Sequence, residues 1–415
     1  MPELLRNRWQ VGTHCRKLGT INGQIARNED SNNPRSRMRN PFLGLRPALE
    51  IMVREGRVLP ATGQAIEDMM RPDQEEAYDR VRLGTEHGLL NIVIEAPNRT
   101  LYVDCPTIHR CDKHLFRYFL DGSARTFYLG NIVEGDRQTP IHVSQVGAAV
   151  VYRDTGGRVR IAKAENKLVL LMNKEEVSFG NEIERSVRSA GDRYIFVDLK
   201  EEDLQTDGIK AGKEPRSRAA HKANWIMRTV EKEIAEGLVR VDGEWLMLDG
   251  GLGSEYAKDW KEGKDYLGVV KSSWKELKFS VSGGRGAKHT INTYELLSNL
   301  KTGQRTLAFG LRDGLIATWF IRIRGPEYLD FPLMGVLRVE LPNPTMQPVS
   351  SDAITEISGA LVAERCVSPH GRDVRWHSHL YPIYLAEQAV KNDFASTEIL
   401  KSGLKWPLPP NGRLA

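Results

Sequence analysis

Cysteine is scarce in this sequence. Four occur in 415 residues, Cys15, Cys105, Cys111 and Cys366, which is too few and too scattered for a disulfide scaffold. Long apolar runs are also missing: no stretch approaches the ~18 residues of a membrane helix, and the first ten residues contain no signal-peptide core. We therefore expect a cytoplasmic protein that works without a membrane.

A strong charge of one sign is absent from the chain as a whole. It has 59 Lys and Arg against 54 Asp and Glu, and its hydrophobic share of 40% favours a globular protein with a packed core. The charge is uneven, however, because residues 1–60 hold eleven Lys and Arg against five Asp and Glu. Arg35, Arg37 and Arg39 alternate within this segment. Such a segment suits phosphates or an acidic partner surface, and a solvated arm is the alternative.

The pattern of apolar segments indicates a mixed α/β protein. Residues 1–110 form a basic, mixed extension with helices expected at 48–54 and 62–70. Five strands follow, and the tetrapeptide at 154–157 is typical of a hairpin between two of them. We predict that the first strand ends at Asp121-Gly122-Ser123. The segments then expected are a helix at 218–236, strands at 244–248, 266–270, 315–322 and 335–341, and helices at 353–365 and 385–392.

Acidic residues stand at informative places in this pattern. Asp121 and Asp249 each end an apolar strand and precede glycine, Glu231 or Glu233 lies on the helix between them, and Glu387 lies on the last helix. Carboxylates at one edge of a sheet can bind two divalent cations that orient a water for attack on phosphorus. Hard oxygen ligands select Mg²⁺ or Mn²⁺. Asp-Gly pairs are also common turn residues, so each pair alone is a weak signal.

The order of these motifs resembles that of NurA-type nucleases over roughly residues 115–395. The segments that carry the resemblance are Leu120-Asp121-Gly122-Ser123, Arg228 with Glu231 and Ala235, Leu248-Asp249-Gly250-Gly251-Leu252, Gly268-Val269-Val270-Lys271, residues 337–342 from Leu337 to Pro342, and Tyr381-Pro382 with Leu385 and Glu387.

The resemblance implies an RNase H-like mixed central sheet flanked by helices in residues 111–415, with residues 1–110 as an extension for partner or DNA docking. It implies cleavage of DNA phosphodiesters with two Mn²⁺ or Mg²⁺ ions, by a homodimer that works with a HerA-type hexameric ATPase. By carry-over, Asp121, Glu231 and Asp249 would be metal ligands, with Glu387 completing the set. Lys271 would contact the phosphate, and Arg338 would do the same or hold the site together.

The sequence departs from the family at one place. The family's final motif usually continues to an Ala-His pair, and the corresponding residues here are Gln388 and Ala389. Glu387 supplies the last ligand, or His377 or His379 approaches from the preceding loop, or the site is weakened. A catalytically weakened subunit that binds DNA or assembles with the translocase is therefore the alternative function. An RNA-directed nuclease is a further one, although no aromatic RNA-reading stretch is present.

A glycine-rich segment, residues 282–290, superficially resembles a phosphate loop. It lacks the Gly-Lys-Ser/Thr ending of a nucleotide-binding loop, so we expect a flexible basic loop instead. Arg285 and Lys288 in this loop are candidates for contact with the DNA backbone. Since no nucleotide-binding motif occurs in the chain, the energy for DNA movement would come from the ATPase partner.

Overall fold

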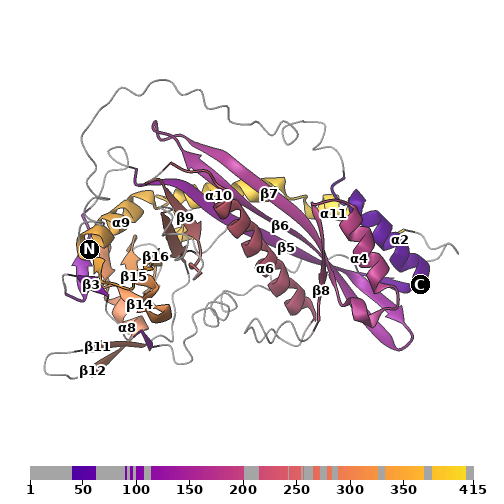
Figure 1. Cartoon of the computed structure of the whole chain (residues 1–415), viewed down its shortest axis with the longest axis horizontal. Helices are drawn as coiled ribbons and strands as arrows, with labels where there is room; N and C mark the ends of the chain where they lie inside the picture. The colour runs from indigo at the N-terminus through magenta and orange to yellow at the C-terminus, as the bar shows by residue number, and fades with distance from the viewer. Residues whose placement is uncertain are drawn as a thin grey trace.

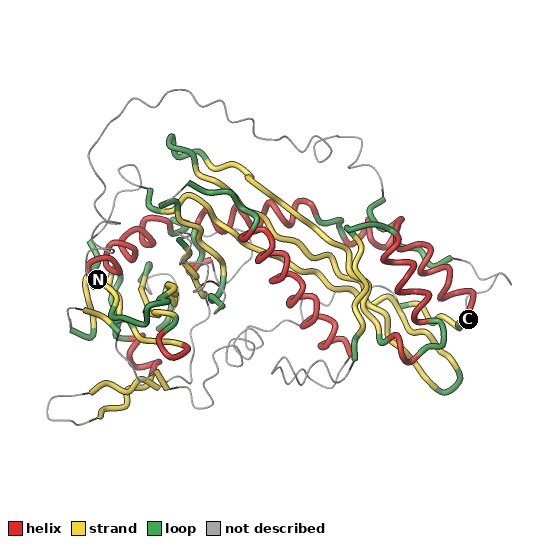
Figure 2. Tube along the Cα trace, in the orientation of Figure 1, coloured by secondary structure: helices red, strands yellow, loops and turns green. Residues whose placement is uncertain are grey.

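The computed structural model describes residues 40–61, 89–90, 94–96, 100–106, 114–200, 215–241, 243–253, 256, 265–271, 278–282, 288–325, 332–368 and 376–407. Their main feature is a twelve-stranded mixed sheet with helices packed against it (Figure 1 and Figure 2). The predicted helix at 62–70, the basic Arg35, Arg37 and Arg39, and Arg285 lie outside the described residues.

The large sheet has ten strands in one continuous order and two strands that pair beside it. The order is β4 (Tyr102–Asp104), β13 (Gln304–Thr306), β15 (Ile316–Arg322), β16 (Val336–Pro342), β10 (Tyr266–Val270), β9 (Trp245–Asp249), β5 (Phe116–Glu134), β6 (Arg137–Arg153), β7 (Val159–Met172) and β8 (Tyr194–Asp198). Beside it, β1 (Arg57–Pro60) pairs with β5, and β14 (Phe309–Leu311) with β15. Strand β6 runs antiparallel to its neighbours β5 and β7, whereas β5, β9 and β10 are parallel.

Two small sheets and several helices complete the described structure. The small sheets are β12 (Lys288–Asn292), β11 (Lys278–Ser282) and β2 (Leu89–Leu90), and β17 (Val349–Ser350) with β3 (Glu95–Ala96). The α-helices are α2 (Arg46–Glu55), α4 (Gly180–Ser189), α6 (Pro215–Glu236), α8 (Thr293–Ser298), α9 (Ser351–Glu364), α10 (Tyr381–Asp393) and α11 (Thr397–Gly403). The predicted helices at 218–236 and 353–365 and the strands at 244–248 and 266–270 are confirmed within one to three residues.

The 3₁₀ turns are η2 (Leu43–Leu45), η4 (Lys174–Glu176), η7 (Arg312–Gly314) and η8 (Trp376–Ser378). Helix α10 begins four residues before the predicted start, at Tyr381. Proline is tolerated in the first turn of a helix, because its missing N–H would have no intrahelical partner there. Pro382 therefore lies inside α10 rather than before it.

The prediction that a strand ends at Asp121 is wrong. Strand β5 runs without a break from Phe116 to Glu134, and Asp121 and Gly122 pair with Ala149 and Ala148 of β6. Asp-Gly is a turn signal only where the chain is free to turn, and here seventeen residues of β6 hold the segment extended. The hairpin predicted at 154–157 does form: Gly157 donates its N–H to the Asp154 carbonyl at 3.0 Å, with φ at +78°.

Alternate residues of the strands enter two different cores. Leu120, Leu246 and Leu248 pack with Val230 and Ile234 of α6. Their neighbours Phe119 and Met247 pack instead with residues of α9 and α10. Because successive side chains of a strand point to opposite faces, α6 covers one face of the sheet, and α9 and α10 cover the other.

The long strands β5, β6 and β7 continue well past the ends of β9 and β10, as Figure 1 shows. Over this extension they pack with α2, α4 and β1 in a separate apolar cluster that includes Phe42, Leu49 and Phe127. The described part of residues 1–110 thus joins the main sheet through β1 and β4. The division of the chain at residue 110 stays a prediction.

Candidate functional site

Two aspartates lie where parallel strands β5 and β9 separate. Leu120 pairs with Leu248, and the next residues along each strand are Asp121 and Asp249. Strand β10 runs parallel to β9 with Val269 beside Asp249, and Lys271 follows two residues later. Parallel strands bring their carboxyl ends to the same edge of a sheet. Residues that are up to 150 positions apart in the sequence are thereby brought together.

Lys271 forms an ion pair with Asp249. Its Nζ lies 2.7 Å from Oδ2 of Asp249, and both side chains are largely buried. Burial alone would lower the pKa of Lys271, but the carboxylates of Asp249, Asp121 and Glu387 outweigh this effect and raise the pKa above its usual value. The Lys271 ammonium is therefore the internal counter-charge of these three acids.

Asp121 is the most deeply buried acid of the group, with 5% of its surface exposed. Burial raises its pKa well above the usual value, and the negative charges of Asp249, Glu387 and Glu231 raise it further. The charge of Lys271 opposes these effects without cancelling them. A backbone N–H, that of Gly122, donates to Oδ1 of Asp121 at 2.8 Å. The charged form of Asp121 is therefore disfavoured, first by burial and then by the acids around it.

Glu387 reaches the same group from α10. Helix α10 packs on the face of β5 toward which Phe119 and Asp121 both point. The carboxylate of Glu387 is largely buried and pairs with Lys391 one turn later at 2.7 Å. Its charge contributes to the raised pKa values of both Asp121 and Lys271.

Glu231 approaches from the opposite face, on α6. A Cβ atom on Gly122 would lie only 2.6 Å from Oε1 of Glu231, so the absence of a side chain at Gly122 lets this carboxylate lie against β5. Glu231 is 6% exposed and pairs with Arg228 at 3.9 Å. Glu233, the other acid considered on this helix, is exposed to solvent. Of the two, Glu231 is the one that belongs to the site.

The turn after Asp249 rests on two buried charged residues of β16. Gly250 has φ at +116°, a conformation that favours glycine. Glu340 accepts a hydrogen bond from the N–H of Leu252 at 2.7 Å, and Arg338 pairs with Glu340 at 3.0 Å. Arg338 is only 2% exposed, which supports a role in holding the site together. Contact of Arg338 with phosphate stays a prediction.

Glu340 supports the turn after Asp249 and is an addition to the predicted site residues. It lies in residues 337–342, one of the segments that carry the resemblance. The spacing of Glu340 from Arg338 indicates that the two can form an ion pair, because residues two apart on a strand share one face. Arg228 also lies in a segment that carries the resemblance without being a predicted site residue. It borders both Glu231 and Gly250, since a Cβ on Gly250 would lie 3.0 Å from Nη1 of Arg228.

The remaining predicted residues lie apart from these contacts or outside the description. Lys288 begins β12, and the description does not extend to its side chain. His377 and His379 are buried, and Nδ1 of His377 accepts the N–H of Gly335 at 3.0 Å. Ala389, at the place of the family histidine, packs against Ala149, the partner of Asp121 across the sheet. A histidine there would therefore be directed to the neighbourhood of Asp121.

The acids fit a divalent metal in chemistry but are not already arranged around one. Within the described part of the chain, no three His, Cys, Asp or Glu side chains form a group that could hold a metal ion. The donors are nevertheless hard carboxylate oxygens, and a divalent cation would stabilise the charged form of Asp121. In this conformation the Lys271 ammonium holds Asp249 instead.

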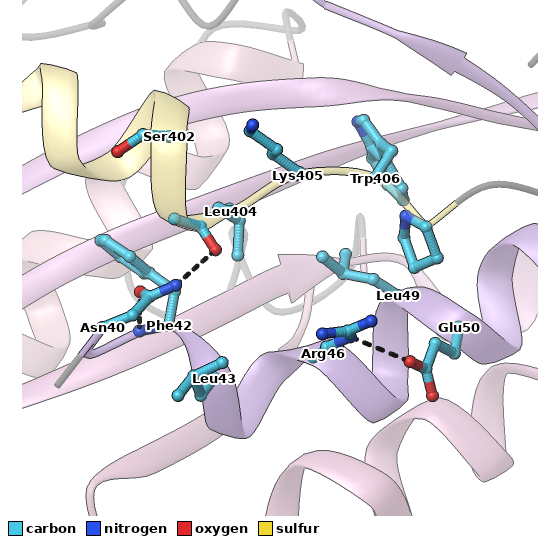
Figure 3. Close-up of a pocket in the computed structure, with 12 residues that line it drawn as sticks. Asn40, Phe42, Leu43, Arg46, Leu49, Glu50, Ser402, Leu404, Lys405 and Trp406 are labelled. Carbon is cyan, nitrogen blue, oxygen red and sulfur yellow. Dashed lines mark hydrogen bonds and ion pairs between the residues drawn. The ribbon is translucent and has the colours of Figure 1, made fainter.

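A pocket of about 710 Å³ lies elsewhere, between α2 and the segment after α11 (Figure 3). Its walls include Phe42, Arg46, Leu49, Leu404 and Trp406, which come from the two ends of the described chain. None of the predicted site residues lines this pocket. The carboxylates lie elsewhere, at the point where β5 and β9 separate.

Comparison with known proteins does not identify a family. No protein-family model matches the chain, and no curated protein matches it either. Of the helices in the described residues, none has the length and apolar character needed to cross a membrane. A function must therefore be inferred from the arrangement of the site itself.

Proposed function

We propose that this protein is a divalent-metal-dependent nuclease of NurA type that hydrolyses DNA phosphodiesters. The observation that carries the proposal is the meeting of Asp121, Asp249, Glu387 and Lys271 on one face of the sheet, where β5 and β9 separate. Glu231 adds a fourth carboxylate from the other face. Structural ion pairs normally stabilise the charged forms of their members, whereas burial and neighbouring acids disfavour the charged form of Asp121.

The strand order supports an RNase H-like centre for the sheet. Such a sheet has an antiparallel meander of three strands, with a fourth strand parallel to the first and a fifth beyond it. The order β7-β6-β5-β9-β10 has this form, and α6 precedes β9 along the chain, after α4 and β8. The acids occupy the first strand, the connecting helix and the end of the fourth strand, as the resemblance to NurA-type nucleases implies.

The proposed metal ligands are Asp121, Asp249, Glu231 and Glu387, with Mn²⁺ or Mg²⁺ as the ions. When bound, two such ions would orient a water for in-line attack on phosphorus and stabilise the leaving oxygen. The chain's own contribution is to hold the carboxylates in place. Gly122 lets Glu231 come close, and Glu340 fixes the turn that carries Asp249.

Lys271 would exchange its partner when substrate binds. Without substrate its ammonium balances Asp249 and Asp121. A phosphodiester at the sheet edge offers the same charge, and an ammonium binds phosphate oxygens as a strong hydrogen-bond donor. We therefore assign Lys271 to phosphate binding. A raised pKa keeps it positively charged for this role at neutral pH.

Partners and location follow from the same proposal. A homodimer that receives DNA from a HerA-type hexameric ATPase is consistent with a chain in which we find no nucleotide-binding motif. A role in DNA end processing or in defence against phage DNA would use the same chemistry. The described cysteines, Cys105 and Cys366, are buried and form no disulfide with each other, which is consistent with a cytoplasmic location.

The proposal is tested by digesting linear DNA with the full chain in Mn²⁺. We expect Asp121→Asn and Asp249→Asn to reduce cleavage to background, because each removes a carboxylate ligand with little change of shape. Asp192→Asn is the matched control, since Asp192 is an exposed acid outside this site. Binding of Mn²⁺, measured by calorimetry, should fall in both site variants and persist in the control. Cleavage by both site variants at the wild-type rate would refute the assignment.

The second candidate is a catalytically weakened subunit that binds DNA or assembles with the ATPase. Two observations favour it: the described acids form no ready metal group, and Ala389 replaces the family histidine. This candidate predicts no cleavage with Mn²⁺ or Mg²⁺ even in the presence of the ATPase, while complex formation persists. The Ala389→His variant distinguishes an active nuclease from a weakened subunit. If the wild type does not cleave DNA and this variant does, the missing histidine is the cause of the lost activity.

A further inference from the structure

Lys391 lies on helix α10 beside the proposed metal ligand Glu387. Its Nζ lies 2.7 Å from Oε1 of Glu387, one helical turn earlier, and the Lys391 side chain is 43% exposed. Partly exposed ion pairs at this helical spacing contribute little to stability, because water and salt screen them. The ammonium of Lys391 can therefore change its partner when Glu387 acquires another ligand.

The end of α10 that carries Lys391 is held firmly on the sheet. Val390 packs against Ala149 of β6, and Ala149 pairs with Asp121 of β5. The side chain of Gln145 on β6 forms two hydrogen bonds with the backbone just after the helix, at 2.7 and 2.9 Å. With the helix fixed in this way, a change of partner requires only a new rotamer of the Lys391 side chain.

Two lysines are thus paired with acids that we propose as metal ligands. Lys271 pairs with Asp249 at 2.7 Å and is 11% exposed. Lys391 pairs with Glu387 at the same distance in a more exposed position. A divalent cation has twice the charge of an ammonium and takes carboxylate oxygens as ligands. Once it binds these acids, both ammonium groups become available to phosphates.

We propose that Lys391 is a second phosphate-binding residue of the site, which Glu387 holds until metal binds. The buried Lys271 contacts the phosphate that is cleaved, and the exposed Lys391 contacts a neighbouring phosphate. This inference rests on the proposed function, because it takes DNA as the substrate and Glu387 as a metal ligand. It adds a consequence for binding: metal raises the affinity for DNA partly by releasing a lysine.

A purely structural role for Lys391 makes a different prediction. Lysine in the last turn of a helix interacts favourably with the helix dipole and with an acid one turn earlier. Loss of such a residue would lower the melting temperature and leave the affinity for DNA unchanged. Because the side chain is exposed, we expect Lys391→Gln to keep the wild-type melting temperature and to change DNA binding instead.

The first test is binding of a fluorescent linear duplex to the full chain, measured by anisotropy in EDTA so that the DNA stays intact. Glu387→Gln frees Lys391 without metal, so this variant should bind DNA more tightly than the wild type. Part of the gain comes from the lost negative charge itself. Adding Lys391→Gln isolates the other part: the slope of log K against log salt should fall by about 0.9, the value for one phosphate contact.

The second test asks whether metal releases the lysine. It uses Mn²⁺ and a duplex with phosphorothioate linkages, which resist hydrolysis. Lys391→Gln in the otherwise wild-type chain should again reduce the slope by about 0.9. In EDTA the same variant should have the wild-type slope, because Glu387 neutralises the ammonium there.

The matched control is a pair of the same type on α6. Nζ of Lys232 lies 3.5 Å from Oε1 of Glu236, also one turn apart, and the Lys232 side chain is 44% exposed. Glu236 is not among the proposed metal ligands. Glu236→Gln should therefore give no gain in DNA affinity that depends on Lys232, and Lys232→Gln should leave the slope unchanged in Mn²⁺.

Four outcomes would overturn the inference: no gain in Glu387→Gln, a gain that persists after Lys391→Gln is added, an equal lysine-dependent gain in the control pair, or equal slopes for Lys391→Gln and the wild type in Mn²⁺. The Mn²⁺ cleavage assay separates the two proposals. If the wild type cuts no DNA but the gain in Glu387→Gln depends on Lys391, the nuclease proposal fails and Lys391 still binds phosphate. If the wild type cuts DNA and no slope depends on Lys391, this inference fails alone.

Discussion

Two buried carboxylates, Glu95 and Asp121, differ in what surrounds them. Arg305 donates two hydrogen bonds to Glu95, at 3.0 and 2.7 Å, and both side chains are fully buried. Burial alone would raise the pKa of Glu95, but the hydrogen bonds from Arg305 and Ser351 bring it below its usual value. The pKa of Asp121 is raised instead.

Glu95 belongs to a network whose charges are balanced, and Asp121 does not. The Arg305 guanidinium also bonds Ser351 and Thr355, so this network joins β13 to β3 and α9 with its charges balanced. Asp121 has acids as neighbours and shares one lysine with them. Proteins keep such unbalanced groups where function requires them, at a cost in stability. The first group stabilises the fold, and the second is the group that we propose to bind metal.

The largest expected effect is a loss of stability when the ion pair of Glu95 and Arg305 is broken. Glu95→Gln should lower the free energy of unfolding by about 3–5 kcal/mol, because it leaves the Arg305 charge buried without its partner. Urea unfolding at pH 7 measures this. Because the folded pKa of Glu95 lies below its ordinary value of 4.5, its contribution is present above that pH and is lost as the pH falls through the folded value. The stability of the wild type should therefore fall more steeply in acid than that of Glu95→Gln.

A double substitution controls for this interpretation. Glu95→Leu with Arg305→Met replaces the pair by apolar side chains and should restore most of the lost stability. If Glu95→Gln unfolds at the wild-type urea concentration, the description of this group as a structural element is wrong.

A smaller effect is expected at Gly122, which links the sheet to the acidic group. A Cβ there would lie 2.6 Å from Oε1 of Glu231 and 2.8 Å from Cγ of Met227. Gly122→Ala should cost about 1–3 kcal/mol of stability through overpacking, and it should displace Glu231 and reduce Mn²⁺-dependent cleavage. Gly156→Ala is the control, since its Cβ would meet only Asp154, at 3.3 Å. Equal cleavage activity of Gly122→Ala and Gly156→Ala would show that Glu231 takes no part in the site.

The smallest expected effect is a gain in the stability of the metal-free protein when Asp121 is replaced. Asp121→Asn removes a charge that burial and Asp249 disfavour, so the metal-free protein should become more stable. We expect a rise in melting temperature of about 2 °C or more, measured by calorimetry in EDTA. Asp192→Asn, at an exposed position, should leave the melting temperature unchanged. A lower melting temperature for Asp121→Asn would mean that this acid is a structural residue like Glu95.

Local pattern was enough to predict much of the framework. The apolar spacing of α6, the short apolar runs of β9 and β10, and the turn at 154–157 are each visible within a few residues. These elements form because the period of the side chains matches the geometry of the element that buries them. The identities of Asp121, Asp249 and Lys271 as candidates followed from their places next to such runs.

The tertiary structure decided what the local pattern left open. Asp-Gly at 121–122 is a turn signal by composition, yet pairing with β6 keeps it extended, and the space beside Gly122 is filled by Glu231. Burial selects Glu231 over Glu233, and it places Arg338 beneath the turn that follows Asp249. These outcomes depend on contacts between residues that are 26 positions apart, as in the pairing of Gly122 with Ala148, or up to 109 apart, as between Gly122 and Glu231. A local pattern of a few residues contains none of them. The residue types determined which chemistry is available, and long-range packing determined which of those residues meet.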